Sequence, residues 1–217
     1  MAEPTEAHLD PIAALEQVPV LVLASGSPRR RELLGRLGIA FEVRVPDIDE
    51  TPLPGEPATT YVERLAQEKA AAARGEGWDG RDEVLVAADT TVDVDGEIVG
   101  KPADAREAAR TLRRLSGRTH LVHTGVAVCR GDRLRSSVTT STVRFHALEP
   151  DLIADYVATG EPLDKAGGYG LQGPGGRLVA SIEGSASNVV GLPMAQTEAL
   201  LRSVGFDPVT WGPPRPD

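Results

Sequence analysis

The sequence predicts an α/β fold, with an α+β-like arrangement on one mixed sheet, and three observations support this class. Of the 217 residues, 41% are apolar, which is enough for a sizeable core. The apolar runs 18–24 and 84–88 are typical of buried strands. The stretches 119–129 and 134–145 alternate in polarity around a Gly-Asp turn and so predict an antiparallel pair. Because helical and strand patterns mix without strict alternation, a mixed sheet is favoured over a doubly wound one.

Helices are predicted where apolar residues recur at helical spacing between start and stop signals. Ser27 is a good N-cap and Pro28 suits the first helical position, while Gly38 marks the end of that helix. Thr59 or Thr60 is a candidate cap for the next helix. The predicted helices are 11–17, 28–37, 59–74, 105–115, 150–157 and 193–204.

The other elements follow from turn chemistry. The sequence Asp95-Gly96 predicts the two-residue turn of a hairpin over 92–99. The buried run 84–88 is expected to end at Asp89, and the glycine-rich stretch 167–176 is expected to form a loop. Further strands are predicted at 41–45 and 178–182. We expect one domain over 18–205, between an N-terminal extension, 1–17, and a C-terminal tail, 206–217.

Composition excludes several classes of function. The formal net charge of −9 argues against general affinity for nucleic acid or an anionic membrane, since both need a basic face. Cys129 is the single cysteine, which excludes an internal disulfide and a cysteine-based zinc site. No apolar run approaches the roughly 20 residues of a membrane span, and residues 1–17 lack the pattern of a secretory signal. We therefore expect a cytoplasmic protein.

The segment 25–31, Ser-Gly-Ser-Pro-Arg-Arg-Arg, places three arginines in the first turn of a predicted helix. The backbone there is already the positive end of the helix dipole, so each cation is disfavoured by about 0.3–1 kcal/mol. A bound anion would offset that cost, because free N–H groups, serine hydroxyls and guanidinium groups converge at this turn. The segment predicts a phosphate site, and the alternative is a solvated basic turn.

Further stretches carry polar residues that packing alone does not explain. Asp89 follows a buried strand, at the position where α/β sheets place their ligands. Its carboxylate could bind a divalent cation or orient a water molecule. The alternative is that Asp89 caps a turn. Lys101 lies between a glycine and a proline as a point charge for phosphate, unless it is simply solvated. The segment 164–173 sets Tyr169, a stacking face, and Gln172, an amide, among glycines that permit close approach to a ligand; a flexible loop is the alternative.

The acidic loop 47–57 is a second candidate metal site. Asp47, Asp49 and Glu50 offer the carboxylates that a divalent cation needs, although a solvated acidic loop is the simpler interpretation. Lys69 lies on the predicted helix 59–74. Residues six apart occupy different helix faces, so Glu63 is not expected to pair with Lys69.

In this order, the stretches resemble the Maf family of nucleoside triphosphate pyrophosphatases. The resemblance implies an elongated two-lobed fold, of the Maf and inosine triphosphatase kind, with a central cleft and often a homodimer. It also implies hydrolysis of a nucleoside triphosphate to the monophosphate and diphosphate with a divalent metal cation, Mg²⁺ or Mn²⁺. The matching pieces span residues 18 to 205: 25–31, 49–50, 66–70, 88–90, 100–102, 116–117 with His120, 166–173 and 188–193.

Matching position by position, the resemblance implies roles for individual residues. Asp89 is expected to be the general base that activates water. The implied catalytic residues are Asp89, Lys69, Lys101 and Gln172. The implied phosphate-binding residues are Ser25, Ser27, Arg29 and Arg30. The implied metal ligands are Asp89 and Glu50. Ala-Asp-Thr at 88–90 and Tyr-Gly-Leu-Gln at 169–172 resemble the branch that acts on dTTP and UTP more than the branch that acts on 7-methyl-GTP.

Two other functions fit parts of this pattern. One is a non-catalytic, nucleotide-binding regulator of septum formation and cell division, which the family name suggests. The other is a phosphate-binding module for a phosphosugar. Asp89, Lys69 and Lys101 favour catalysis, because a protein that only binds a nucleotide does not need a base aimed at phosphate. The predicted partner is a nucleoside triphosphate substrate, with no nucleic acid and no membrane.

Overall fold

The computed structural model describes residues 19–75, 78, 80 and 82–211. The strands are β1 (Val20–Ala24), β2 (Phe41–Val43), β3 (Glu83–Val94), β4 (Glu97–Val99), β5 (Thr119–Arg130), β6 (Arg133–Phe145) and β7 (Val179–Glu183). The α-helices are α1 (Pro28–Gly35), α2 (Ala58–Ala72), α3 (Ala105–Leu115), α4 (Pro150–Ala158), α5 (Ala186–Val190), α6 (Met194–Ser203) and α7 (Pro208–Trp211). Short 3₁₀ helices are η1 (Glu161–Asp164), η2 (Ala166–Gly168) and η3 (Pro174–Leu178).

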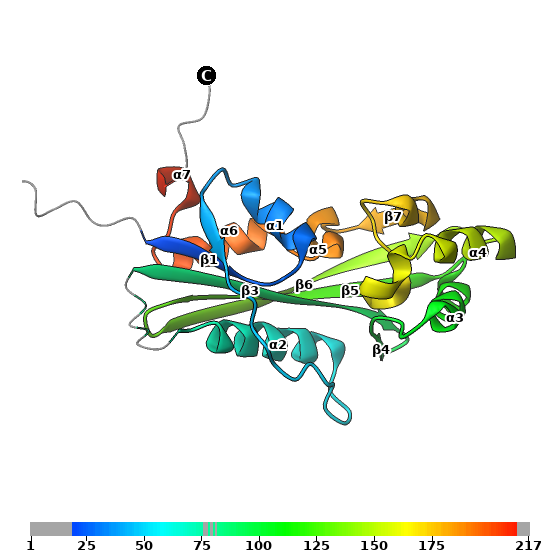
Figure 1. Cartoon of the computed structure of the whole chain (residues 1–217), viewed down its shortest axis with the longest axis horizontal. Coiled ribbons are helices and arrows are strands. Elements are labelled where there is room, and N and C mark those ends of the chain that lie inside the picture. Colours follow the sequence, from blue (N-terminus) through cyan, green and yellow to red (C-terminus); the bar gives the residue numbers. More distant parts are fainter. Residues whose placement is uncertain (1–18, 76–77, 79, 81, 212–217) are drawn as a thin grey trace, which may run out of the picture.

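These strands form one mixed sheet, as predicted. The seven strands run in the order β2-β1-β3-β5-β6-β7, with β4 paired to β3 off this path. Strand β1 is parallel to β2 and β3, and the other pairs are antiparallel. Figure 1 shows an elongated molecule in which α1, α5 and α6 lie over one face of the sheet and α2 over the other. The α/β class and its mixed sheet are confirmed.

Strand β3 is longer than predicted, and the prediction that it ends at Asp89 is wrong. Its first residues pair in parallel with β1, and this pairing stops at Ala87 opposite Ala24. The antiparallel ladder with β5 runs from Leu85 to Asp93, so the strand keeps a partner on that side past Asp89. Asp89 therefore lies within a long strand, beside the point where β1 gives way to α1.

Local signals were right about some element ends and wrong about others. The Asp95-Gly96 turn has φ of 58° and 83°, as a primed hairpin turn requires. No side chain caps α2, which follows Pro57, so the threonine caps are wrong. Helix α5 was not predicted, and part of the glycine-rich stretch forms η2 and η3 instead of irregular loop. The predicted helix 11–17 lies outside the described residues.

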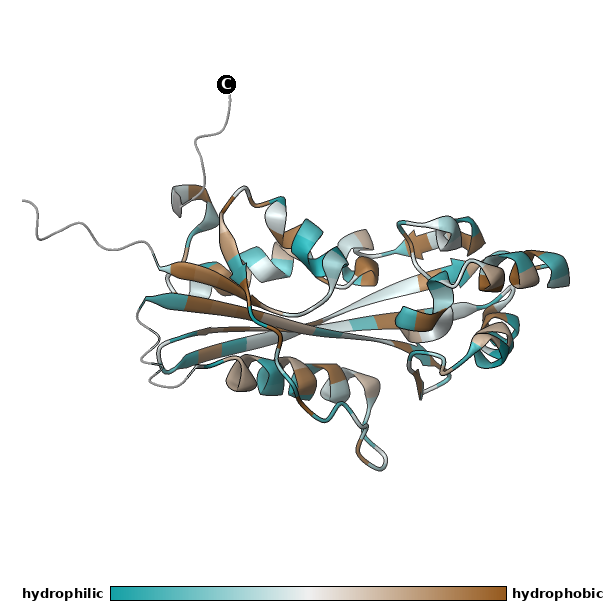
Figure 2. Ribbon diagram, in the orientation of Figure 1, coloured by the Kyte–Doolittle hydropathy of each residue, from teal (hydrophilic) through white to brown (hydrophobic). Residues whose placement is uncertain are grey.

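The core includes a cluster at each end of the sheet, and further clusters lie where α2 packs on the sheet. At the β1 end, Leu21, Leu34 and Phe206 pack between the sheet and helices α1 and α6. At the far end, a cluster that includes Leu112 and Tyr156 packs β3 and β5 against α3 and α4. Figure 2 shows hydrophobic residues concentrated along β1, as expected of a strand covered on both faces. None of the helices in the described part of the chain has the length and apolar character needed to cross a bilayer.

Gly125 of β5 permits the close approach of α2 to the sheet. A Cβ atom at this position would overlap the Val62 carbonyl, which is backbone and cannot rotate away. Helix α2 therefore lies directly on the sheet face and presents Lys69 toward β3. Glycine is required here for space.

Candidate active site

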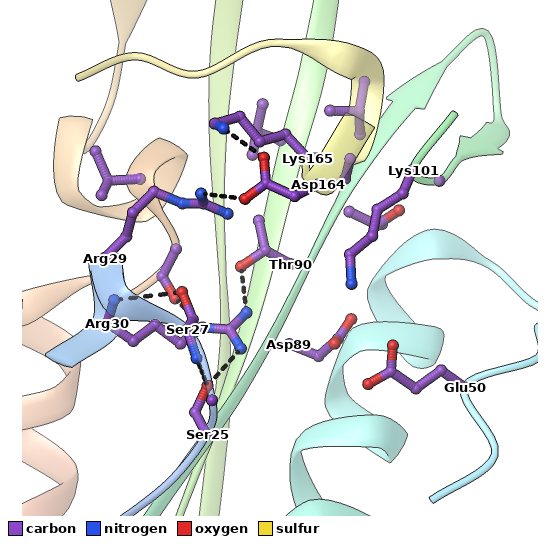
Figure 3. Close-up of a pocket in the computed structure, with 18 of the residues that line it drawn as sticks. Ser25, Ser27, Arg29, Arg30, Glu50, Asp89, Thr90, Lys101, Asp164 and Lys165 are labelled. Carbon is purple, nitrogen blue, oxygen red and sulfur yellow. Dashed lines mark hydrogen bonds and ion pairs between the residues drawn. The ribbon is translucent and has the colours of Figure 1, made fainter. Parts of the chain in front are cut away.

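A cavity of about 640 Å³ lies where the β1–α1 turn, α2, β3 and the η1–η2 segment meet. Its size suits a nucleotide-sized ligand. The residues to which the family resemblance gave a role all line it: Ser25, Ser27, Arg29, Arg30, Glu50, Lys69, Asp89, Lys101 and Gln172. Asp47 and Asp49, of the second candidate metal site, do not. Figure 3 shows the arginine turn on one side of the cavity and Asp89, Glu50 and Lys101 on the other.

The start of α1 has the predicted cap. The Ser27 hydroxyl accepts a hydrogen bond from the Arg30 backbone N–H at 3.5 Å, and Pro28 occupies the first turn. The Ser25 hydroxyl in turn accepts from the Ser27 N–H at 3.2 Å. The three arginines then diverge, because Arg29 and Arg30 line the cavity whereas Arg31 is exposed and outside its lining.

Arg30 is held by neutral acceptors only. Its Nε donates to the Gly191 carbonyl at 2.9 Å, and its terminal nitrogens donate to Ser25 Oγ at 3.3 Å and Thr90 Oγ1 at 3.1 Å. Burial lowers the pKa of its guanidinium, against the attraction of Asp89. Arg30 forms no ion pair with any described residue, so its charge remains available to an anionic ligand.

Lys69 joins two carboxylates on the opposite wall. Its Nζ lies 2.7 Å from Asp89 Oδ1 and 2.6 Å from Glu50 Oε1. The Lys69 and Asp89 side chains are only 8% and 10% exposed, so this pair is shielded from water. Burial alone would raise the pKa of Glu50, but the hydrogen bond from Lys69 and the charges of Lys69 and Lys101 leave it lowered. Both carboxylates are therefore brought to one ammonium group.

The loop that carries Glu50 is tied to α2. The Tyr61 hydroxyl donates to the Glu50 backbone carbonyl at 2.9 Å. Arg64 donates two hydrogen bonds of 2.7 Å to the Glu56 carboxylate, and these bonds lower the pKa of Glu56 to about 2. Asp47, Asp49 and Glu50 are all exposed, as the simpler interpretation of the loop predicted. Of the three, Glu50 alone lines the cavity, where it contacts Lys69.

Lys101 and Gln172 occupy different positions around the cavity. Lys101 points into it and makes no hydrogen bond or ion pair within the described residues (Figure 3). Gln172 is exposed, and its amide donates to the Glu32 carboxylate at 3.2–3.3 Å. Lys101 is thus free for a ligand, while Gln172 lies at the rim and would have to leave Glu32 to reach one.

Several residues that line the cavity were not assigned a role from the sequence. Asp164 accepts hydrogen bonds from Arg29, at 3.2 Å, and from Lys165, so a carboxylate already lies among the cations. Thr90 contacts Arg30 as described above. These positions lie inside the quoted segments 88–90 and 164–173, but their contacts with Arg29 and Arg30 join distant parts of the chain and leave no local signal.

Tyr169 is more buried than a stacking face should be. The residue is 6% exposed, and its ring packs edge-on against His120 and Phe145. Its hydroxyl lies 2.8 Å from His120 Nε2, and burial strongly raises its pKa. The ring belongs to the core beneath the cavity, so it does not present the open stacking face that was expected.

The carboxylates offer oxygen donors for a cation. One carboxylate oxygen of Asp89 and one of Glu50 contact the Lys69 ammonium. No described residue donates a hydrogen bond to the second oxygen of either carboxylate. Within the described residues, no group of three or more His, Cys, Asp or Glu side chains comes together for a metal. Mg²⁺ commonly takes one or two carboxylates and completes its shell with substrate phosphates and water, so this donor set fits such an ion.

This fold and cavity define an α/β protein in which an arginine-bearing turn faces a lysine-bound carboxylate pair. Residues 20–204 match the family described as Maf-like protein, and the chain belongs to that family. A dTTP/UTP pyrophosphatase of Anaeromyxobacter dehalogenans (strain 2CP-C) is 55% identical over 201 residues, which cover 90% of this chain and 99% of the relative. A dTTP/UTP pyrophosphatase of Myxococcus xanthus (strain DK1622) is 54% identical over 195 residues, 88% of this chain and 95% of the relative.

Proposed function

We propose that this protein hydrolyses nucleoside triphosphates, dTTP and UTP above all, to the monophosphate and diphosphate. The observation that carries the proposal is the Lys69–Asp89 pair facing Arg30 across one cavity of nucleotide size. The relatives that are 55% and 54% identical, and nearly completely covered, are named dTTP/UTP pyrophosphatases. They favour the pyrimidine branch over the branch for 7-methyl-GTP.

In this proposal the triphosphate lies between the two walls of the cavity. Ser25, Ser27 and the start of α1 supply hydroxyl and N–H donors, while Arg29 and Arg30 neutralise the non-bridging oxygens. Lys101 approaches from the opposite side without a competing partner among the described residues. Phosphoryl chemistry depends on positioning and neutralising charge, and this distribution of cations suits it.

Asp89 is the proposed general base. A water oxygen forms a bond to the α-phosphorus as one of its protons passes to the Asp89 carboxylate, and the bond from the α-phosphorus to the bridging oxygen breaks to release diphosphate. Lys69 holds the carboxylate in place from α2. Gln172, at the rim, is proposed to contact the nucleotide after leaving Glu32.

We further propose a divalent cation, Mg²⁺ or Mn²⁺, held by Asp89 and Glu50 together with phosphate oxygens. Such an ion would neutralise charge on the triphosphate and polarise its phosphorus centre. The two carboxylates that converge on Lys69 support this position.

Product analysis tests the function. The purified protein is incubated with Mg²⁺ or Mn²⁺ and, separately, UTP, dTTP, CTP and 7-methyl-GTP, and the products are separated by chromatography. We expect monophosphate and diphosphate from UTP and dTTP. Turnover of 7-methyl-GTP alone would reject the pyrimidine preference, and release of inorganic phosphate with a nucleoside diphosphate would reject attack at the α-phosphorus.

A non-catalytic regulator is the less favoured alternative, because the similar relatives are named as enzymes. Binding of UTP with no turnover under either metal would favour it. The single domain over 18–205, the homodimer and the cytoplasmic location are proposals from the sequence.

A further inference from the structure

A row of hydroxyl groups, from half-buried Thr90 to buried Thr124, leads away from the cavity behind Arg30. Arg30 donates to Thr90 Oγ1 at 3.1 Å, and Thr90 Oγ1 lies 2.9 Å from Thr124 Oγ1. Thr124 then donates to the backbone carbonyl of Asn188 at 3.0 Å. Thr124 and Asn188 are both fully buried, so water cannot replace these partners. The row joins the cavity wall to helix α5.

The chemistry of its two ends fixes the direction of every hydrogen bond in the row. A guanidinium group only donates and a carbonyl only accepts, while each threonine hydroxyl has a single proton. The Thr124 hydroxyl donates its one proton to the Asn188 carbonyl. In the hydrogen bond between the two threonines, Thr90 must therefore be the donor. Thr90 therefore turns its oxygen lone pair toward Arg30 and its proton away from the cavity.

Two further acceptors hold the Arg30 guanidinium in place. Gly191, directly after α5, accepts from Nε, and Ser25 accepts from one terminal nitrogen. Three of the five N–H donors of an arginine are thereby used, and the two others have no partner among the described residues. The end of α5 thus contacts Arg30 twice, directly through Gly191 and indirectly through Thr124 and Thr90.

We propose that Thr124 is a positioning residue for the reaction. Its hydroxyl, anchored on the Asn188 carbonyl, sets the direction of the Thr90 hydroxyl and thereby orients the free N–H groups of Arg30 toward the triphosphate. The proposal rests on the proposed function, in which Arg30 binds the phosphates of the substrate.

Thr139 supplies a matched control. It lies directly opposite Thr124 on β6, and its hydroxyl is buried without a hydrogen-bond partner in the described part of the chain. Valine has the shape of threonine without the hydroxyl. Thr124→Val and Thr139→Val therefore make the same chemical change in neighbouring places, and only the first interrupts the row.

Steady-state kinetics with UTP and Mg²⁺ test the proposal on the full chain. Thr124→Val is expected to raise KM roughly tenfold with a smaller change in kcat, the effect of one lost buried hydrogen bond. Thr124→Ser keeps the hydroxyl and should restore KM, and Thr139→Val should match the wild type. In an Arg30→Ala background, Thr124→Val should have no further effect, because residues that act through one another do not add.

Two results would overturn the proposal. One is a wild-type KM in Thr124→Val; the other is an equal rise in KM from Thr124→Val with and without Arg30. If Thr124→Val does not fold, Thr124→Cys, whose thiol is a weak donor, provides the comparison. If the wild type hydrolyses no nucleotide, the proposed function is rejected, and the proposal for Thr124 is tested separately. Calorimetric binding of inorganic diphosphate then decides the role of Thr124: weaker binding in Thr124→Val supports it, and equal binding rejects it.

Discussion

Lys69 Nζ lies 2.7 Å from Asp89 Oδ1, in a contact that joins helix α2 to the middle of strand β3. The same ammonium lies 2.6 Å from Glu50. Two carboxylates so close together would repel each other, and the cation between them removes that cost. The arrangement directs both carboxylates at the cavity, which a base and a metal ligand require.

Replacing Asp89 should separate binding from turnover. Asp89→Asn keeps the shape of the side chain but cannot accept a proton from water, so we expect kcat for UTP to fall by at least about a hundredfold. Nucleotide binding should persist, because the arginine turn is untouched. The control is Asp95→Asn, in an exposed turn whose φ of 58° suits asparagine. A near wild-type kcat in Asp89→Asn would remove Asp89 from the role of base.

Asp164 should compete with phosphate for the cations that it contacts. Its bonds to Lys165 and Arg29 lower its pKa despite partial burial, so it is ionised at neutral pH. Asp164→Asn removes that charge, and inorganic diphosphate should bind about two- to fivefold more tightly by calorimetry at low salt. Asp155→Asn, exposed on α4, is the charge-matched control. Unchanged or weaker binding in Asp164→Asn would contradict the competition.

His120 should make stability depend on pH. Burial lowers its pKa to about 4, whereas an unfolded histidine titrates near pH 6.5. Between these values the unfolded chain binds a proton that the folded protein does not, so stability falls as the pH falls. From pH 7 to pH 5 this loss amounts to roughly 2 kcal/mol.

Urea unfolding at pH 7 and pH 5 measures that loss. His120→Gln retains a partner for the Tyr169 hydroxyl but does not titrate, so its free energy of unfolding should change less between the two pH values than that of the wild type. Equal losses in the two proteins would show that His120 is not the titrating group.

Gly125→Ala should destabilise the fold. The added Cβ meets the Val62 carbonyl, and α2 has to move away from the sheet. Overpacking of this kind costs about 1–3 kcal/mol, measured by urea unfolding. Because α2 carries Lys69, turnover of UTP should fall as well. The control is Gly75→Ala, since nothing lies within 4 Å of a Cβ there. Equal stability of the two variants would argue against close packing at Gly125.

Features encoded by neighbouring residues were predictable from the sequence. The Ser27 cap, the Asp95-Gly96 turn and helix α3 depend on interactions between residues a few positions apart. The ordered motifs, through the family resemblance, also pointed to several residues that line the cavity, because each motif is a short local pattern. Helix α5 was missed because its five residues are too few to show a period.

By itself, the sequence determined the mixed α/β class, the capped arginine turn and part of the set of polar residues at the site. The tertiary structure decided how they meet. Asp89 and Lys69 are 20 residues apart and Thr124 and Asn188 are 64 apart, so no local propensity encodes either contact. The β5 ladder carries β3 past Asp89, and the absence of a side chain at Gly125 brings α2 onto the sheet. Packing across the sheet, a property of the whole chain, fixes which side chains share the cavity.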